Sequence, residues 1–336
     1  MLQVTLETPG HFVAVDGPSP APGPGEALVR VHAIGICGTD LHAFAGRQPF
    51  FKYPRILGHE LGVEVVDPGS EPNGLSAGDR CSVEPYLNCG RCIACRAGRS
   101  NCCDTLNVLG VHIDGGMRPA IAVPARKLHR SGTLTFDQLA LVETLGIGAH
   151  AVERACITPD DFVLVIGAGP IGLSVSQFVQ VRGATLAVMD LRESRLDFCR
   201  RQLGVVHTVA AGPDALERIR AIGNGELPTV VMDATGSAAS MAGTFDLAAQ
   251  GGRVVFVGLF QGEVSFNDPN FHRRELTLLA SRNAVPGNFR EIIGLLEAGR
   301  IDVTPWISHR FGLEDTPHRF PEIAARTDVI KAVISV

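Results

Sequence analysis

The segment GAGPIG, residues 167–172, constrains the fold of this chain more than any other feature. It follows the apolar run DFVLVI and precedes IGLSVSQFVQ, which is typical of a buried helix. Glycines at such a junction permit a tight turn, let backbone amides approach a pyrophosphate, and allow the helix to pack on the strand. An ordinary strand-to-helix turn is the alternative interpretation. The predicted dinucleotide-binding residues of the turn are Gly167, Gly169, Pro170, Ile171 and Gly172.

The chain from about residue 151 to 284 alternates strand and helix patterns. Buried parallel strands are predicted at 161–167, 184–190, 229–236 and 252–258, with a closing strand at 275–281. Apolar strands that alternate with helices are typical of a doubly wound parallel sheet. We therefore predict a Rossmann NAD-binding domain at 151–284.

Asp190 ends the second of these strands, about twenty residues beyond the glycines. A carboxylate at this place accepts hydrogen bonds from the ribose 2′- and 3′-hydroxyls and repels a 2′-phosphate. This favours NAD over NADP. Arg192 and Arg195 follow closely and could soften that preference, and Arg195 is included among the predicted cofactor-binding residues.

The first 150 residues contain short β runs, such as 26–36 and 61–69, that Gly and Pro interrupt repeatedly. This pattern favours a β-rich, barrel-like domain with long functional loops. The tail at 285–336 contains one helical pattern and a final β run, VIKAVISV, which could return to pack on the first domain. The predicted fold class is thus α/β, with domains at 1–150 and 151–284 and a return segment at 285–336.

Five cysteines lie within the fifteen residues 89–103. The N-terminus shows no secretory signal, so we expect a cytoplasmic protein, and clustered cysteines in a reducing compartment are more often metal ligands than disulfides. Small buried apolar residues or a redox pair are the alternatives. The spacing C-x2-C-x2-C-x7-C suits one structural zinc ion and leaves Cys102 over. The predicted ligands are Cys89, Cys92, Cys95 and Cys103.

A second candidate metal site lies in ICGTDLHAF and ILGHELG, which supply Cys37, His59 and Glu60. Thiolate, imidazole and carboxylate all suit zinc. Adjacent side chains on a regular strand point to opposite faces, so His59 and Glu60 reach one ion only if the backbone bends. A core or surface role is the alternative.

Composition and charge narrow the partners. The chain has 336 residues, 45% hydrophobic, enough for two cores, and a net charge of -5. This charge argues against nucleic acid and anionic membrane surfaces as partners, and no apolar run is long enough to span a membrane. A small-molecule substrate is expected. A non-catalytic zinc-knuckle module remains an alternative, which the charge and the glycine motif disfavour.

These motifs, in this order from about residue 20 to the C-terminus, resemble the zinc-dependent medium-chain alcohol and polyol dehydrogenases. The resemblance implies a GroES-like catalytic domain built from both chain ends, a Rossmann domain, and an active cleft between them. It implies two zinc ions per subunit, a catalytic one at Cys37, His59 and Glu60 and a structural one at the four cysteines. It also implies a homodimer or homotetramer.

The same resemblance assigns roles to single residues. Thr39 stands where the family bonds the substrate oxygen, and His42 where it passes the proton onward. Glu143 stands where polyol and threonine dehydrogenases carry glutamate, and Arg282 where polyol dehydrogenases carry an arginine near the substrate. The implied reaction is NAD-dependent oxidation of a secondary alcohol on a polyol or sugar acid to a ketone. A threonine-type dehydrogenase is the alternative, and Arg118 departs from the common pocket sequence.

Overall fold

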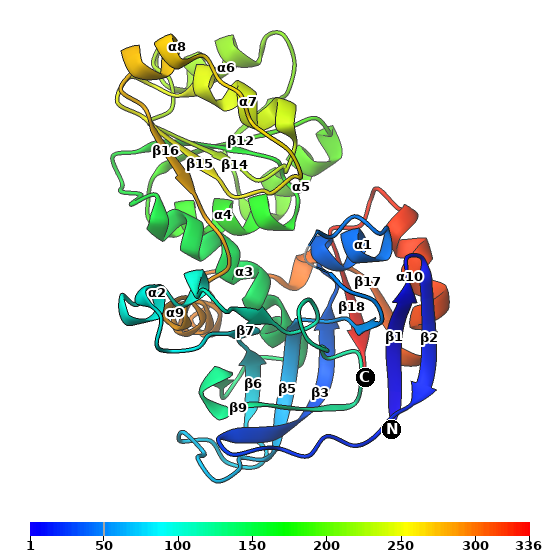
Figure 1. The fold of residues 1–336 in the computed structure, drawn as a ribbon. Helices are drawn as coiled ribbons and strands as arrows, with labels where there is room; N and C mark the ends of the chain where they lie inside the picture. Colours follow the sequence, from blue (N-terminus) through cyan, green and yellow to red (C-terminus); the bar gives the residue numbers. More distant parts are fainter. Residues whose placement is uncertain (50) are drawn as a thin grey trace. The chain divides into compact units, whose positions relative to one another are not determined.

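The computed structural model describes residues 1–49 and 51–336. The described chain forms two compact units. Unit 1 comprises Met1–Thr144 and Ala284–Val336, and unit 2 comprises Leu145–Asn283. The chain leaves unit 1 within helix α3 (Phe136–Arg154). Both chain ends therefore belong to unit 1 (Figure 1).

Unit 2 contains a parallel sheet with the strand order β13-β12-β11-β14-β15-β16. Its strands are β11 (Phe162–Ile166), β12 (Thr185–Asp190), β13 (His207–Ala210), β14 (Val230–Asp233), β15 (Arg253–Phe256) and β16 (Thr277–Ala280). The five segments predicted as strands contain β11, β12, β14, β15 and β16. β13 was missed, because its sequence HTVA is short and only Val209 in it is fully buried.

The helices of unit 2 cover both faces of this sheet, with α4 and α5 on one face and α6, α7 and α8 on the other (Figure 1). They are α4 (Pro170–Val181), α5 (Glu193–Leu203), α6 (Ala215–Ile222), α7 (Ala238–Leu247) and α8 (Asp268–Arg273). Leu164, Ala187 and Val231 on neighbouring strands are completely buried. Burial from both sides explains why these strands are almost uniformly apolar.

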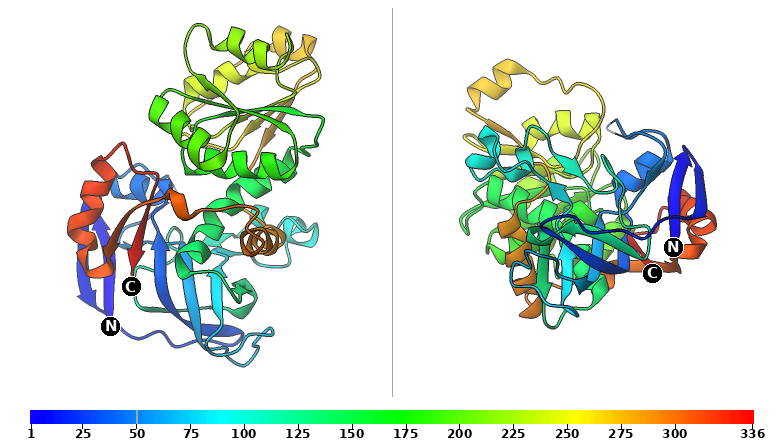
Figure 2. Two further views of the ribbon diagram at one scale, coloured as in Figure 1. Left: turned by 180° about the vertical axis from the view of Figure 1, so that it is seen from behind. Right: turned by 60° about the horizontal axis from the view of Figure 1, so that its bottom comes forward.

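Unit 1 is built on a larger, mostly antiparallel sheet with the order β10-β6-β5-β3-β18-β17, and β9 also pairs with β3. Its strands are β3 (Glu26–Gly35), β5 (Glu60–Asp67), β6 (Arg80–Val83), β9 (Ala120–Pro124), β10 (Leu128–Ser131), β17 (Ile307–Gly312) and β18 (Lys331–Ser335). The C-terminal strand β18 pairs antiparallel with β3, with Ile334 opposite Ile34. The left view of Figure 2 shows the C-terminal strand within this sheet from behind.

Smaller elements complete unit 1. Two short sheets have the orders β2-β1-β4 and β7-β8. They consist of β1 (Leu2–Thr8), β2 (His11–Asp16), β4 (Arg55–Ile56), β7 (Tyr86–Leu87) and β8 (Asn107–Val108). The helices are α1 (Gly38–Phe44), α2 (Ile93–Arg96), α9 (Pro286–Glu297) and α10 (Thr316–Ala325), with 3₁₀ turns η1 (Ser100–Cys102), η2 (Ala125–Lys127), η3 (Thr304–Trp306) and η4 (Leu313–Asp315). Within residues 1–49 and 51–336, no helix has the length and apolar character that crossing a membrane requires.

Asp161 ties the first strand of unit 2 to segments distant in the sequence. Its Oδ2 accepts hydrogen bonds from Thr158 N at 2.8 Å and Thr158 Oγ1 at 3.2 Å, and its Oδ1 accepts from Thr229 Oγ1 at 2.7 Å and pairs with Arg253. Burial alone would raise the pKa of Asp161, but these hydrogen bonds and the charge of Arg253 lower it below its ordinary value. The ionised carboxylate therefore stabilises the fold.

We predict that Asp161→Asn lowers the free energy of unfolding by about 1–3 kcal/mol at neutral pH, because buried donors lose a charged acceptor. Since the folded-state pKa is depressed, this stabilisation is present above the unfolded-state pKa of about 4 and disappears as the pH falls through the folded-state value. Urea unfolding at pH 7 and at acid pH measures the effect. Asp160→Asn, at the exposed neighbouring position, is the control. Equal stability of both variants at pH 7 would refute the role of Asp161.

Candidate metal centres and dinucleotide site

Cys37, His59 and Glu60 come together in unit 1. One ligand atom of each lies within 4.8 Å of the others. Cys37 precedes α1 as its N-cap residue, His59 lies just before β5, and Glu60 is the first residue of β5. Gly58 has a φ of +93°, in the left-handed region that favours glycine. The chain therefore bends before His59, and the two adjacent side chains can face one point.

Asp40, on α1, connects two of these residues. Its Oδ2 accepts a hydrogen bond from Cys37 N at 2.9 Å, and its Oδ1 lies 3.6 Å from His59 Nδ1. Burial alone would lower the pKa of His59, but the charges of Asp40 and Cys37 raise it well above its ordinary value. A carboxylate beside a histidine orients the ring and strengthens it as a metal ligand. Asp40 lies within CGTDLH but was not among the residues predicted to have a role.

Glu60 is paired with Lys331, a residue 271 positions later on β18. Both side chains are almost completely buried. Burial alone would lower the pKa of Lys331, but the charges of Glu60 and Cys37 raise it. Gly35, opposite Glu60 in the β3–β5 ladder, makes room for this carboxylate, since a Cβ there would lie 2.0 Å from Glu60 Oε2. Lys331 was not predicted, because it lies in a β run that contains no motif.

Glu143 lies on α3 and is also buried. The hydroxyl of Tyr86 donates a hydrogen bond to its Oε1. Burial raises the pKa of Tyr86 well above its ordinary value, and the charge of Glu143 adds to this effect, so the hydroxyl keeps its proton. Among the described residues, Glu143 is not one of the three whose ligand atoms lie within 4.8 Å of one another. Its charge nevertheless contributes to the raised pKa of His59. Tyr86 was not predicted, because nothing in EPYLNCG marks it.

The chemistry of this centre fits zinc. Thiolate, imidazole and carboxylate are the ligands that zinc takes in proteins. Glu60 Oε2 is buried and has no hydrogen-bond partner within residues 1–49 and 51–336. Because an orphaned buried carboxylate oxygen is costly, a cation at this point would satisfy it.

Thr39 and His42 follow Cys37 on α1. Thr39 is half-buried and His42 is exposed. His42 lines a groove of about 690 Å³ between α1 and α10, together with Leu41 and Arg47. The structure thus keeps both residues on the helix that Cys37 caps, and their roles in substrate and proton handling stay predictions.

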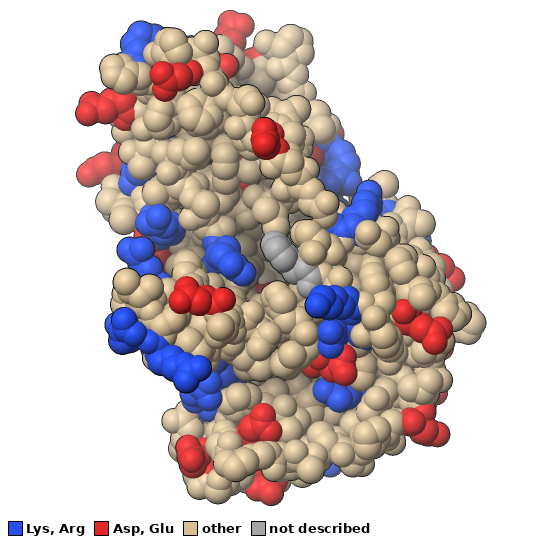
Figure 3. Space-filling view, in the orientation of Figure 1, with Lys and Arg blue, Asp and Glu red and all other residues tan. Residues whose placement is uncertain are grey.

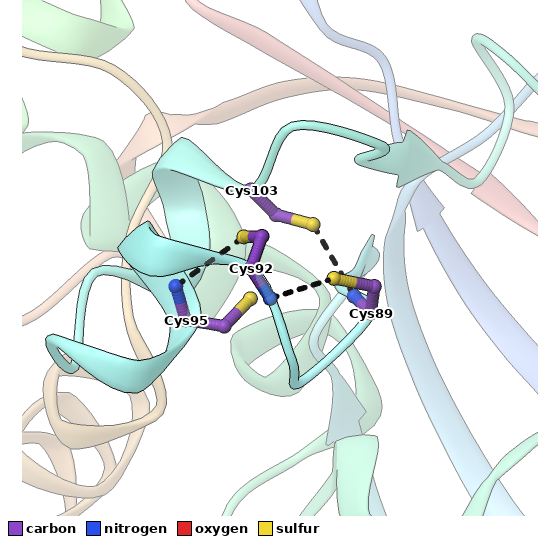
Figure 4. Close-up of side chains that lie close together, drawn as sticks. All are labelled: Cys89, Cys92, Cys95 and Cys103. Carbon is purple, nitrogen blue, oxygen red and sulfur yellow. Dashed lines mark hydrogen bonds between the residues drawn. The ribbon is translucent and has the colours of Figure 1, made fainter.

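The cysteines at 89, 92, 95 and 103 converge on one point (Figure 4). Their sulfur atoms lie within 4.8 Å of one another. The chain between them supplies N–H donors: Cys89 N to Cys103 Sγ at 3.2 Å, Cys92 N to Cys89 Sγ at 3.4 Å, and Cys95 N to Cys92 Sγ at 3.5 Å. Hydrogen bonds from the backbone N–H groups of Arg91 and Cys92 lower the pKa of Cys89 to about 6. Backbone hydrogen bonds lower the pKa of Cys92 as well, whereas the pKa of Cys95 is raised despite the hydrogen bond from Asn88. This four-cysteine lobe therefore favours the thiolate, the form that binds zinc, at Cys89 and Cys92.

Cys102 is exposed on η1 and lies outside this set of four sulfur atoms in the described chain. The fourth sulfur of the lobe is therefore that of Cys103, which follows Cys95 after a gap of seven residues, and not that of Cys102. Asn88 adds a side-chain hydrogen bond to Cys95 Sγ at 3.4 Å.

The glycine turn of unit 2 has the expected close contacts. Gly167 has a φ of +95°, and a Cβ at Gly172 would lie 1.7 Å from Gly167 O. Gly169 is the N-cap residue of α4, and Pro170 is at its first turn, where the missing N–H costs nothing. The turn leaves the first backbone amides of α4 free of intrahelical partners, which is the usual setting for a phosphate.

Asp190, at the end of β12, lies beside this turn. Its Oδ2 accepts a hydrogen bond from Ala168 N at 2.7 Å, and its Oδ1 accepts from Arg192 N at 2.8 Å. Arg192 Nε is 3.9 Å from the same oxygen. These contacts fix the carboxylate next to the glycines, with further lone pairs left for ribose hydroxyls.

The other two predicted residues of unit 2 differ in exposure. Arg195 is buried on α5, whereas Arg282 is exposed beyond the end of β16. Neither observation tests a ligand role. Acidic and basic side chains are interspersed over the face of the molecule drawn in Figure 3, in keeping with the modest net charge of -5.

Known families match most of this chain. A family described as the alcohol dehydrogenase GroES-like domain matches residues 23–133, and one described as zinc-binding dehydrogenase matches residues 170–298. L-galactonate-5-dehydrogenase of Escherichia coli (strain K12) is 40% identical over 94% of this chain and 93% of its own length. D-altritol 5-dehydrogenase of Agrobacterium fabrum (strain C58) is 35% identical over 91% of each chain.

Solved structures agree with these matches. An alcohol dehydrogenase of E. coli CFT073, described as short-chain and complexed with NADH, superposes with a TM-score of 0.92 at 28% identity, over 100% of this chain and 99% of that one. A zinc-binding dehydrogenase of Sinorhizobium meliloti 1021, bound to NADP, has a TM-score of 0.90 at 31% identity, over 100% and 99%. The predicted fold class, a GroES-like β-rich domain with a Rossmann domain, is confirmed. The chain is a dehydrogenase that belongs to the zinc-binding alcohol dehydrogenase family.

Proposed function

We propose that this enzyme oxidises a secondary hydroxyl of a polyol or sugar acid to a ketone, with NAD as the acceptor and zinc at Cys37, His59 and Glu60. The observation that carries the proposal is the buried set of these three ligands with a second carboxylate, Glu143, beside it. A glutamate at position 143 is what the polyol branch of the family carries. The two relatives described above act, by their names, on a sugar acid and a polyol, each at carbon 5.

The ligand set determines what the site can do. Bound there, zinc would supply a Lewis acid that makes a substrate hydroxyl more acidic. Lys331 offsets the charge of Glu60, the Cys37 thiolate and the Glu60 carboxylate would together offset the two charges of zinc, and Asp40 orients His59. Thr39 hydrogen-bonds the substrate oxygen and acts as a relay, since its hydroxyl takes up the substrate proton as it gives up its own, and the exposed His42 passes that proton on to solvent.

The glycine turn and Asp190 would hold the dinucleotide, whose nicotinamide ring accepts the hydride. Arg282 is proposed to bind a hydroxyl or carboxylate of the substrate, because a guanidinium donates in a fixed fork. The four-cysteine lobe is proposed to hold the second, structural zinc ion. A homodimer or homotetramer in the cytoplasm stays a prediction.

A substrate screen of the zinc-loaded protein tests this function. We expect NAD reduction with polyols or sugar acids, in preference to ethanol and other simple primary alcohols. A preference for simple alcohols over every polyol and sugar acid would refute the substrate class. A preference for threonine would instead identify an amino-alcohol dehydrogenase.

Mutations should distinguish the catalytic role of one metal centre from the structural role of the other. Cys37→Ser should abolish turnover, lower the zinc content from two ions to one per chain and lower the unfolding free energy less than Cys95→Ser does, because the Glu60–Lys331 pair and β18 still hold this open centre in place. Cys95→Ser should lower the stability of unit 1, because a closed zinc site contributes folding free energy. Zinc content by elemental analysis and urea unfolding measure these effects, with Cys102→Ser as the control. Equal destabilisation by Cys37→Ser and Cys95→Ser would contradict the division.

Asp190 should decide the choice of nucleotide. Asp190→Ala should weaken NADH binding about 10- to 100-fold, because two charged hydrogen bonds to the ribose are lost. It should also reduce the preference for NADH over NADPH, because the charge that repels a 2′-phosphate is removed. Asp190→Asn keeps an acceptor for Ala168 N and removes the repulsive charge, so it separates damage to the turn from loss of charge. Fluorescence titration with both nucleotides gives the dissociation constants. Unchanged constants in both variants would remove Asp190 from the ribose site.

A further inference from the structure

We propose that Tyr86 is a positioning residue, which fixes the carboxylate of Glu143 beside the catalytic metal centre. The proposal deepens the proposed function and rests on it, since Glu143 matters only if a metal binds at Cys37, His59 and Glu60. Tyr86 lies on β7, far in sequence from Glu143 on α3, and was not marked by any motif.

The contact between these two residues is buried. The Tyr86 side chain is 2% exposed and that of Glu143 is 4% exposed, and the phenol donates to Glu143 Oε1. The terminal torsion of a glutamate is soft, so a free carboxylate rotates easily. A single buried donor on one oxygen fixes the carboxylate plane, and with it the direction of the other oxygen.

The two carboxylates at this centre are held by different kinds of donor. Glu60 is paired with the cation of Lys331, which offsets its charge. Glu143 accepts a hydrogen bond from a neutral phenol, which orients the carboxyl group without adding a positive charge beside it. A neutral hydrogen-bond donor of this kind can orient a carboxylate that binds a cation directly or through a water molecule.

The position of Tyr86 is itself fixed from its N-terminal side. Glu84 is fully buried and accepts hydrogen bonds from Lys127 and, at 3.0 Å, from His129 Nε2. The His129 ring stacks on Phe289 with centroids 4.8 Å apart, and Phe289 meets the Tyr86 ring edge-on at 6.4 Å and 75°. These contacts fix the segment and the ring of Tyr86, so its hydroxyl is held in one orientation towards Glu143.

The test uses Tyr86→Phe in the full-length protein, with zinc kept in the four-cysteine lobe and cobalt(II) placed in the catalytic centre. We expect the cobalt affinity, measured by chelator competition, to fall about 10- to 100-fold and the visible absorption bands of cobalt to shift. The metal content of the lobe should not change. Tyr53→Phe is the matched control, because Tyr53 is the other tyrosine of the chain and its hydroxyl donates to the backbone oxygen of Ala43. It should leave both readouts unchanged.

A double-mutant cycle shows whether Tyr86 acts through Glu143. The variant Tyr86→Phe, Glu143→Gln should bind cobalt about as weakly as Glu143→Gln alone, since the phenol then has no carboxylate to orient. Full additivity, or a cobalt spectrum and affinity of Tyr86→Phe that match the unmutated protein, would overturn the proposal. The cobalt affinity and the cobalt spectrum are measured without turnover. The role of Tyr86 can therefore be refuted even if the substrate class is right, and it can be supported even if the substrate class is wrong.

Discussion

The buried ion pair between Glu60 and Lys331 is the interaction on which unit 1 depends most. It joins the start of β5 to the last strand of the chain, and it lies at the metal centre. A buried charge without a partner is strongly destabilising, so the centre is complete only where the final β run pairs with β3. The site therefore depends on the pairing of β18 with β3.

Small residues make this packing possible. Gly35 leaves room for Glu60, Gly58 bends the chain before His59, and Gly172 lets α4 approach the turn at Gly167. In each case a Cβ would meet another atom at a distance that no side chain tolerates, or the backbone adopts a left-handed conformation. The chemistry of both units thus rests on backbone approach as much as on functional side chains.

β7 connects the two metal centres of unit 1. Tyr86 on this strand meets Glu143, and Asn88, just beyond it, donates to Cys95 in the four-cysteine lobe. The lobe is thereby linked through β7 to the segment that holds Glu143. A closed zinc site suits this purpose because it holds a short, helix-poor loop that has little core of its own.

The sequence by itself determined the family, the fold class and the motifs, because glycine spacing, cysteine spacing and strand–helix alternation are local patterns that chain geometry imposes within a few residues. It thereby named Cys37, His59, Glu60 and the four cysteines as candidates, and the family resemblance added Glu143. Only the tertiary structure added Asp40, Tyr86 and Lys331 as their partners. It also showed that Glu143 is not part of the compact group formed by Cys37, His59 and Glu60 in the described chain. The reason is physical: an orienting partner needs only a donor or charge at one point in space, and a buried contact between residues 57 or 271 positions apart leaves no periodicity in the sequence.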